Sequence, residues 1–236
     1  MKNKNIVLFM MGGSGTRFGE KVPKQFTVLG TKPIFIQILK QLNRVKVIDE
    51  IVIITHPDYL EYTSNMIKEN KIKKIVKIIT GGNGRSKDIL AAMEEVKDTC
   101  NAEDNVLMYD ATHPFVDVEG FTKVVEMINK YRAATLAEFQ YDTTYIINEN
   151  DKTIENVIPR TKVIAGASPE GFKFGEIYDI YKKTPTDELN NLTSAGAIAL
   201  ANNIEMYAVE TEIPNLKITY KKDMEIVRQL SEYYFD

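Results

Sequence analysis

The sequence lacks the features that would place this protein outside a cell or inside a membrane. It contains a single cysteine, Cys100, which excludes an internal disulfide and is typical of a reducing compartment. No apolar run approaches the roughly 18 residues of a membrane-spanning helix. Residues 1–5 are polar and lead directly into an apolar run, unlike a signal peptide. We therefore expect a cytoplasmic protein with no membrane partner.

An excess of one charge is also lacking. The 30 basic and 33 acidic residues give a net charge of −3, so the composition predicts no nucleic-acid partner. With 44% hydrophobic and 27% charged residues, the chain has the composition of an ordinary globular protein. A chain of 236 residues can bury a sizeable core in one α/β domain, so we expect residues 1–236 to form a single domain.

The most informative stretch follows an apolar run at residues 6–11. It reads GGSGTRFG over residues 12–19, with PKQF at residues 23–26. The apolar run predicts a buried strand, and the glycines predict a loop at its C-terminal end. Backbone with few side chains can approach a polyphosphate closely, while Arg17 and Lys24 can meet its charge. We hypothesise a triphosphate site; the alternative is a glycine-rich turn between a strand and a helix.

Two familiar phosphate-binding motifs do not fit this stretch. No glycine is followed by the Lys-Ser/Thr pair of the G-x-x-x-x-G-K-[ST] loop. In the dinucleotide pattern G-x-G-x-x-G, counting from Gly13 through Gly15 places Phe18 where the third glycine should stand. The loop is therefore neither a Walker loop nor a dinucleotide fingerprint.

Strands and helices alternate along the rest of the chain. Apolar runs predict strands at residues 6–11, 50–55, 74–80, 105–109, 133–139 and 206–209. Helical spacing predicts helices at residues 33–42, 58–70, 86–97, 118–131, 174–182, 192–201 and 222–233. This order predicts a mostly parallel sheet covered on both faces, as in Rossmann-like three-layer αβα sandwiches. Ligands of such sheets bind beyond the C-terminal strand ends, where both glycine-rich loops and Asp110 fall.

Residues 141–158 interrupt this alternation. Two β-like stretches, residues 141–147 and 153–158, flank a polar turn at residues 148–152, which predicts a hairpin arm. An isolated hairpin is only marginally stable in water, so the arm should pack on another surface. A second subunit is the natural candidate, which would make the protein a homodimer. The alternative is that the arm folds back on its own domain.

Several of these stretches together resemble a known enzyme family. They are GGSGTRFG with PKQF, GGNGR at residues 81–85, YDATHPFV at residues 109–116, Asp142 with Thr143, Arg160, SPEGF at residues 168–172 and NLKIT at residues 215–219. The chain is similar over nearly its full length to the cytidylyltransferases for 2-C-methyl-D-erythritol 4-phosphate and ribitol 5-phosphate. The resemblance implies that CTP and a small phosphorylated alcohol are substrates, that Mg²⁺ is the cofactor, and that the arm makes a dimer.

The resemblance also implies roles for individual residues. Arg17 and Lys24 match the family's catalytic pair. The matches to nucleotide-binding positions are Met11, Gly12, Gly13, Gly15, Thr16, Gly81, Gly82, Arg85 and Asp88. The matches to positions on the acceptor side are Asp110, His113, Thr143, Arg160, Ser168, Glu170 and Lys217. Asp110 also matches the aspartate beside Mg²⁺, and Thr143 and Arg160 would complete the site of the neighbouring subunit. By themselves, Asp110 could equally be a helix cap and Arg160 a surface salt-bridge partner.

Four positions depart from the family's usual pattern. His113 replaces an arginine, Glu170 a glutamine, Asp88 a serine and Ser194 an aspartate. An imidazole makes a weaker and less rigid phosphate contact than a guanidinium. The Glu170 carboxylate could recognise extra hydroxyls or an amine of the acceptor, or it could make a structural hydrogen bond.

These departures concern the acceptor side more than the loop that carries Arg17 and Lys24. We therefore expect transfer of CMP from CTP to a polyol phosphate such as ribitol 5-phosphate, which gives a CDP-polyol and pyrophosphate for cell-envelope or capsule precursors. One alternative is 2-C-methyl-D-erythritol 4-phosphate as the acceptor, in isoprenoid synthesis. An alternative of another class is a protein that senses CTP without turnover.

Overall fold

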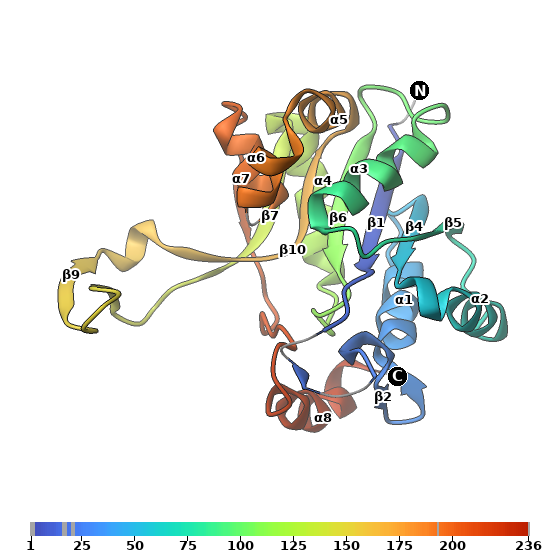
Figure 1. Ribbon diagram of the computed structural model, residues 1–236, viewed down its shortest axis with the longest axis horizontal. Helices are drawn as coiled ribbons and strands as arrows, with labels where there is room; N and C mark the ends of the chain where they lie inside the picture. Colours follow the sequence, from blue (N-terminus) through green and yellow to red (C-terminus); the bar gives the residue numbers. More distant parts are fainter. Residues whose placement is uncertain (1–2, 16–17, 20–21, 193, 236) are drawn as a thin grey trace.

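A mostly parallel sheet forms the centre of the molecule (Figure 1). The computed structural model describes residues 3–15, 18–19, 22–192 and 194–235. Within this part of the chain the sheet has seven strands in the order β11-β7-β10-β6-β1-β4-β5. All pairs are parallel except those of β10, which runs antiparallel to β6 and β7. The predicted α/β class and mostly parallel sheet are confirmed.

The elements follow the predicted order closely. The strands are β1 (Asn5–Met11), β2 (Val28–Leu29), β3 (Lys32–Pro33), β4 (Glu50–Thr55), β5 (Ile75–Thr80), β6 (Asn105–Asp110), β7 (Ala133–Phe139), β8 (Thr144–Ile147), β9 (Ile154–Ile158), β10 (Ile164–Lys173) and β11 (Tyr207–Glu210). The helices are α1 (Ile34–Arg44), α2 (Leu60–Glu69), α3 (Arg85–Val96), α4 (Val118–Tyr131), α5 (Phe174–Lys183), α6 (Thr186–Asn191), α7 (Ala195–Ala201) and α8 (Asp223–Tyr234).

Helices cover both faces of the sheet, which gives the predicted three layers. Because side chains alternate along a strand, Val7 and Phe9 of β1 pack with α1, α2, α4 and α8, while Ile6 and Leu8 pack with α3, α5, α6 and α7. All four side chains are fully buried. No helix in the described part of the chain is long and apolar enough to cross a membrane.

Strand β10 is the main element that the sequence did not predict. The apolar runs predict no strand between residues 158 and 206, whereas the structure has a strand over Ile164–Lys173 in the middle of the sheet. Its small and polar residues lack the strand alternation, and Pro169 argues against a central strand. The pairing shifts register between Gly166 and Glu170, so Pro169 lies at an irregularity where no regular ladder bond is required.

Smaller differences concern the C-terminal half. Helix α7 begins at Ala195 rather than at residue 192, because Ser194 is its N-cap and accepts a hydrogen bond from the Ala197 N–H at 3.0 Å. Helix α6 was not predicted. The segment at residues 215–219 is irregular and crosses the end of β6, where the Ile218 N–H donates to the Thr112 carbonyl at 2.8 Å.

The predicted arm is a hairpin of β8 and β9 that extends away from the sheet (Figure 1). The two strands pair only with each other. Ile154 is 63% exposed and Tyr145 is 51% exposed, so their side chains are not covered by the rest of the chain. The alternative of an arm folded back on its own domain is therefore wrong for this structure. A role of the arm in a dimer stays a prediction.

We predict that Gly171→Ala destabilises the fold through the packing of β10. An added Cβ would lie 2.4 Å from Ile128 Cδ1 of α4 and 3.3 Å from Leu107 Cδ2 of β6. Ile128 and Leu107 are fully buried, so neither can swing aside freely. Overpacking of this kind costs about 1–3 kcal/mol in the free energy of unfolding, which urea denaturation measures.

Gly166→Ala is the matched control in the same strand. A Cβ there meets nothing within 4 Å, so we expect a change within about 0.5 kcal/mol. Equal effects of the two substitutions would contradict this account of β10.

Candidate active site

A pocket of about 680 Å³ opens at the C-terminal ends of β1 and β6. The chain leaves β1 toward β4 and β5 on one side and returns to β6 on the other. This change of direction is the topological switch point at which α/β sheets bind ligands. The lining comprises Met10, Met11, Gly12, Gly13, Ser14, Gly15, Lys24, Gln25, His56, Gly82, Gly84, Arg85, Asp88, Asp110, Ala111, Thr112, His113, Gly166, Ala167, Ser168, Glu170, Ser194 and Lys217.

The glycine-rich loop after β1, the first loop, and the one after β5, the second loop, both pack closely against the Asp88 carboxylate. Asp88 is buried and accepts hydrogen bonds from the N–H groups of Gly82, at 2.9 Å, and Asn83, at 3.2 Å. A Cβ at Gly12 would lie 3.1 Å from Asp88 Oδ2, and one at Gly81 would lie 2.6 Å from it. Glycine is thus required where the loops meet, and Asp88 holds the second loop in place.

Gln25 holds the first loop from within. Its side chain is buried, and Nε2 donates to the carbonyls of Met11, at 2.9 Å, and Gly13, at 2.7 Å. These two bonds fix the backbone at Met11 and Gly13, although this part of the loop carries few side chains. Gly15 lies in this loop with a φ of +69°, a conformation that favours glycine.

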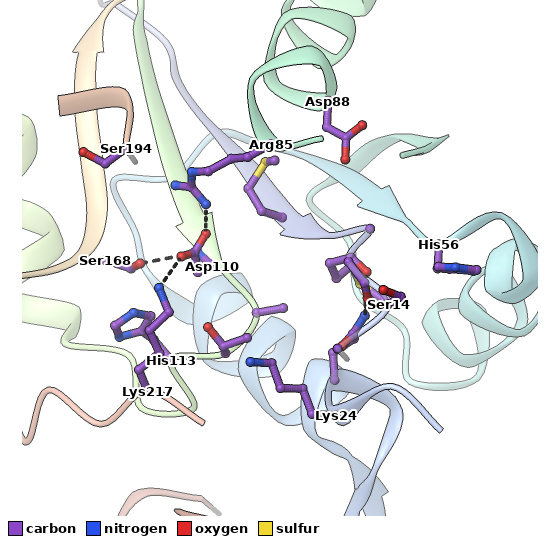
Figure 2. A pocket seen from close by; sticks show the side chains of 18 of the residues that line it. Ser14, Lys24, His56, Arg85, Asp88, Asp110, His113, Ser168, Ser194 and Lys217 are labelled. Carbon is purple, nitrogen blue, oxygen red and sulfur yellow. Dashed lines mark hydrogen bonds and ion pairs between the residues drawn. The ribbon is translucent and has the colours of Figure 1, made fainter. Parts of the chain in front are cut away.

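Lys24 follows this loop, and its side chain reaches into the pocket (Figure 2). Its ammonium donates to the Ile218 carbonyl at 2.5 Å, which connects the first loop to the segment before α8. The predicted residues Thr16 and Arg17 lie outside the described residues.

A cluster of charged side chains lies opposite Lys24 across the pocket (Figure 2). Asp110, at the end of β6, has an ion pair with Arg85 through Oδ1, and Oδ2 lies 3.1 Å from the Lys217 ammonium. Arg85 is the first residue of α3, after Gly84 with its φ of +105°. Burial would raise the pKa of Asp110, but Arg85 and Lys217 outweigh it and hold this pKa well below its usual range. Asp110 is therefore ionised.

His113 lies beside this cluster and is buried. Removal from water lowers its pKa to about 4, so the imidazole is neutral at pH 7. The turn that carries it is held by the Tyr109 hydroxyl, which donates to the carbonyls of His113, at 3.0 Å, and Phe115, at 3.1 Å. A neutral imidazole can donate or accept one hydrogen bond per nitrogen but brings no positive charge to a phosphate.

The pocket gathers most of the predicted residues. Ser168 lies near Asp110, whose N–H donates to its hydroxyl at 3.4 Å. Glu170 makes structural hydrogen bonds with the first N–H groups of α7, which is one of its two predicted roles. Gly81 is not among the lining residues and lies just behind Gly82.

Thr143 lies at the start of the arm and Arg160 directly after it, and neither lines this pocket. Thr143 is exposed, and the exposed Arg160 donates to the Tyr141 carbonyl at 3.0 Å. The idea that they complete the site of a second subunit stays a prediction.

Several lining residues were not assigned to the site from the sequence. Gln25 was noted only as part of PKQF, and the sequence analysis assigns no role to His56. The position of His56 directly after β4 was the available signal, because the ends of neighbouring parallel strands meet at one edge. Gly84 and Thr112 were noted only as parts of GGNGR and YDATHPFV, and Ser194 only as a departure from the family's pattern.

The described acidic side chains of the pocket do not by themselves form a metal site. Among the described residues, no group of three or more His, Cys, Asp or Glu side chains could hold a metal ion. Asp110 presents a carboxylate that two cations already contact, and Mg²⁺ commonly takes one or two carboxylates together with substrate phosphates. The donor set fits Mg²⁺ only when phosphate oxygens complete it.

The switch-point pocket with two glycine-rich loops, Lys24 and the Asp110 cluster places the protein among the α/β nucleotidyltransferases. The family model described as IspD, 2-C-methyl-D-erythritol 4-phosphate cytidylyltransferase, matches residues 6–232. The chain belongs to this family and is a CTP-dependent cytidylyltransferase.

Relatives within the family differ in the acceptor they are named for. The chain is 31% identical over 226 residues to a 2-C-methyl-D-erythritol 4-phosphate cytidylyltransferase of Clostridium tetani, which covers 94% of this chain and 88% of the relative. It is 26% identical to a ribitol-5-phosphate cytidylyltransferase of Lacticaseibacillus paracasei, over 94% of this chain and 95% of the relative.

Solved structures agree on the fold. The 4-diphosphocytidyl-2C-methyl-D-erythritol synthase of Anaerococcus prevotii superposes with a TM-score of 0.79 at 20% identity, and the match covers 98% of this chain and 96% of that one.

We predict that His113 contributes to the pH dependence of stability. Its pKa is about 4 in the folded state against 6.5 in the unfolded chain, so the unfolded state binds an additional proton between these values. The free energy of unfolding should therefore fall as the pH drops from 6.5 to 4, by roughly 3 kcal/mol at most from this site. Denaturant unfolding of wild type and His113→Gln across this range measures it.

The wild type should lose more stability than His113→Gln below pH 6.5, and the two curves should run parallel above pH 7.5. Curves that stay parallel down to pH 4 would contradict a buried, neutral imidazole.

Proposed function

We propose that this protein transfers CMP from CTP to 2-C-methyl-D-erythritol 4-phosphate. The family match over residues 6–232 and the Clostridium tetani relative favour this acceptor over ribitol 5-phosphate, which was the first expectation. The main support for nucleotidyl transfer is the pocket, in which glycine-rich backbone faces Lys24 and the Arg85–Asp110–Lys217 cluster.

The chemistry requires charge stabilisation more than a protein nucleophile. An oxygen of the acceptor phosphate attacks the α-phosphorus of CTP in line, a new P–O bond forms, and the bond to the β-phosphate oxygen breaks. Pyrophosphate leaves with that electron pair. The attacking phosphate is already nucleophilic, so the protein positions both substrates and neutralises charge. Lys24, with Arg17, would stabilise the charge on the α-phosphate and the leaving group.

Mg²⁺ is part of this proposal. Asp110 would hold the ion together with phosphate oxygens of CTP, and the ion would supply neutralisation of the triphosphate charge. Lys217 would exchange its contact with Asp110 for a substrate phosphate.

Ribitol 5-phosphate is the second candidate acceptor because of His113. A neutral imidazole at this position suits a hydroxyl-rich acceptor as well as a phosphate, and the Lacticaseibacillus paracasei relative is named for ribitol 5-phosphate. In that case the product would be a CDP-polyol for cell-envelope precursors.

An acceptor panel tests the reaction. Pyrophosphate release is measured with CTP, Mg²⁺ and either 2-C-methyl-D-erythritol 4-phosphate, ribitol 5-phosphate or other alditol phosphates. We expect the highest kcat/KM with 2-C-methyl-D-erythritol 4-phosphate. Lys24→Ala should bind CTP but lose roughly 100- to 1,000-fold in kcat, the effect typical of a lost electrostatic stabiliser.

A higher kcat/KM with ribitol 5-phosphate would move the assignment to the second candidate. CTP binding without pyrophosphate release for every acceptor would instead indicate a CTP sensor, and near-normal turnover of Lys24→Ala would overturn the mechanism.

We also propose that the arm at residues 141–158 makes a homodimer. Apolar side chains such as Ile154 and Val157 are 63% and 51% exposed on a hairpin that pairs with no other strand in the described part of the chain. Exposed apolar groups on an isolated hairpin favour burial against another surface. A second copy would also bring Thr143 and Arg160 toward its neighbour's pocket.

Charges introduced into the apolar surface test the role of the arm. The double variant Ile154→Asp, Val157→Asp should sediment as a monomer, while Tyr233→Asp, at an 82% exposed site on α8, should keep the wild-type sedimentation coefficient. A dimer that persists in the double variant, or a wild type that is itself monomeric, would contradict the role of the arm.

A further inference from the structure

Glu170 is held in one orientation by the start of α7. Its two carboxylate oxygens accept hydrogen bonds from the N–H groups of Ala195 and Gly196, both at 3.2 Å. The side chain is only 16% exposed. A Cβ at Gly196 would lie 2.9 Å from Oε1, so this close contact depends on glycine. The oxygens of Glu170 are thus already bonded to protein rather than offered to an acceptor hydroxyl.

The negative charge of Glu170 acts instead on Arg85. The second terminal nitrogen of the Arg85 guanidinium lies 3.6 Å from Glu170 Oε2, while the first has the ion pair with Asp110 Oδ1. These carboxylates come from the adjacent strands β10 and β6. Arg85 is therefore fixed from two sides, and a planar guanidinium that contacts two carboxylates has little freedom to turn.

The other cation on Asp110 is held less firmly. Lys217 lies on an irregular segment, its side chain is 49% exposed, and it contacts Asp110 Oδ2 at 3.1 Å. An exposed ion pair of this kind contributes little and exchanges easily. The two oxygens of Asp110 therefore have unequal partners, one fixed and one exchangeable.

We propose that Glu170 is a positioning residue that keeps Arg85 on Oδ1 of Asp110. Incoming substrate phosphate then draws only Lys217 away from the carboxylate, on the Oδ2 side. This inference rests on the proposed nucleotidyl transfer. It assigns Glu170 an effect on the geometry of the charged cluster and no direct contact with the acceptor.

Glu170→Gln tests positioning, with the packing of α7 controlled separately. The amide keeps one oxygen acceptor for α7, loses the other, and removes the charge that holds Arg85. We expect kcat for pyrophosphate release to fall roughly 10- to 100-fold, the range typical when a supporting contact behind a functional group is lost. The Kd for CTP should stay unchanged or fall, because the pocket loses a negative charge that repels the triphosphate.

A double-mutant cycle with Arg85→Lys tests whether the effect passes through Arg85. A lysine ammonium cannot contact both carboxylates as the guanidinium does, so Glu170→Gln should have little further effect on kcat in the Arg85→Lys background. Asn202→Ala is the control for α7: it removes a side-chain hydrogen bond to the Ile198 carbonyl at 2.9 Å, away from Glu170. It should lower Tm slightly and leave kcat unchanged.

The outcomes distinguish this inference from the proposed function. Additive losses in kcat, a weaker Kd for CTP in Glu170→Gln, or an equal kcat loss in Asn202→Ala would each assign Glu170 a structural role only and overturn the proposal. If the wild type releases no pyrophosphate with any acceptor, the proposed function fails. The same cycle measured as Tm then still tests the Glu170–Arg85 coupling, and additivity in Tm would overturn it.

Discussion

The pocket depends on the ion pairs of one carboxylate, Asp110. Its side chain is 16% exposed, and Arg85 and Lys217 both contact it. A carboxylate removed from water is stable as an ion only when cations or hydrogen bonds compensate for the lost hydration. Arg85 begins α3 and Lys217 precedes α8, so three distant parts of the chain meet at Asp110. The Arg85 pair fixes this cluster, and the exposed Lys217 pair is exchangeable. The shape of the pocket and its charge therefore have the same cause.

The glycine-rich loops have few side chains that could fix their backbone by packing. Asp88 and Gln25 fix it instead, through hydrogen bonds to loop N–H and carbonyl groups. Both side chains are buried, and a buried polar group without a hydrogen-bond partner costs the free energy of its lost hydration. These hydrogen bonds avoid that cost. These bonds fix the backbone at Met11, Gly13, Gly82 and Asn83 without placing bulky side chains in the pocket. Asp88, which the resemblance placed among nucleotide-binding positions, acts here on the protein.

Sequence reasoning was most successful where one element buries one continuous apolar pattern. Strands β1, β4 and β6 are mostly apolar and almost entirely buried, and the sequence predicts their ends within one residue. It failed at β10, whose segment around Ser168 and Pro169 has no apolar alternation. Strand β10 forms hydrogen bonds with the backbone edges of both β6 and β7. This pairing depends on residues far away in the sequence, so the local pattern of residues 164–173 does not reveal it.

The sequence by itself determined the alternation of strands and helices, the positions of the glycine-rich loops and the family, because each depends on short local patterns. Only the tertiary structure decided how the charged residues pair. It showed that Asp110 lies between Arg85 and Lys217, that Glu170 faces α7 and Arg85, and that His113 is buried and neutral. The physical reason is that charge and desolvation depend on which strand ends lie side by side, and that neighbourhood is set by long-range pairing.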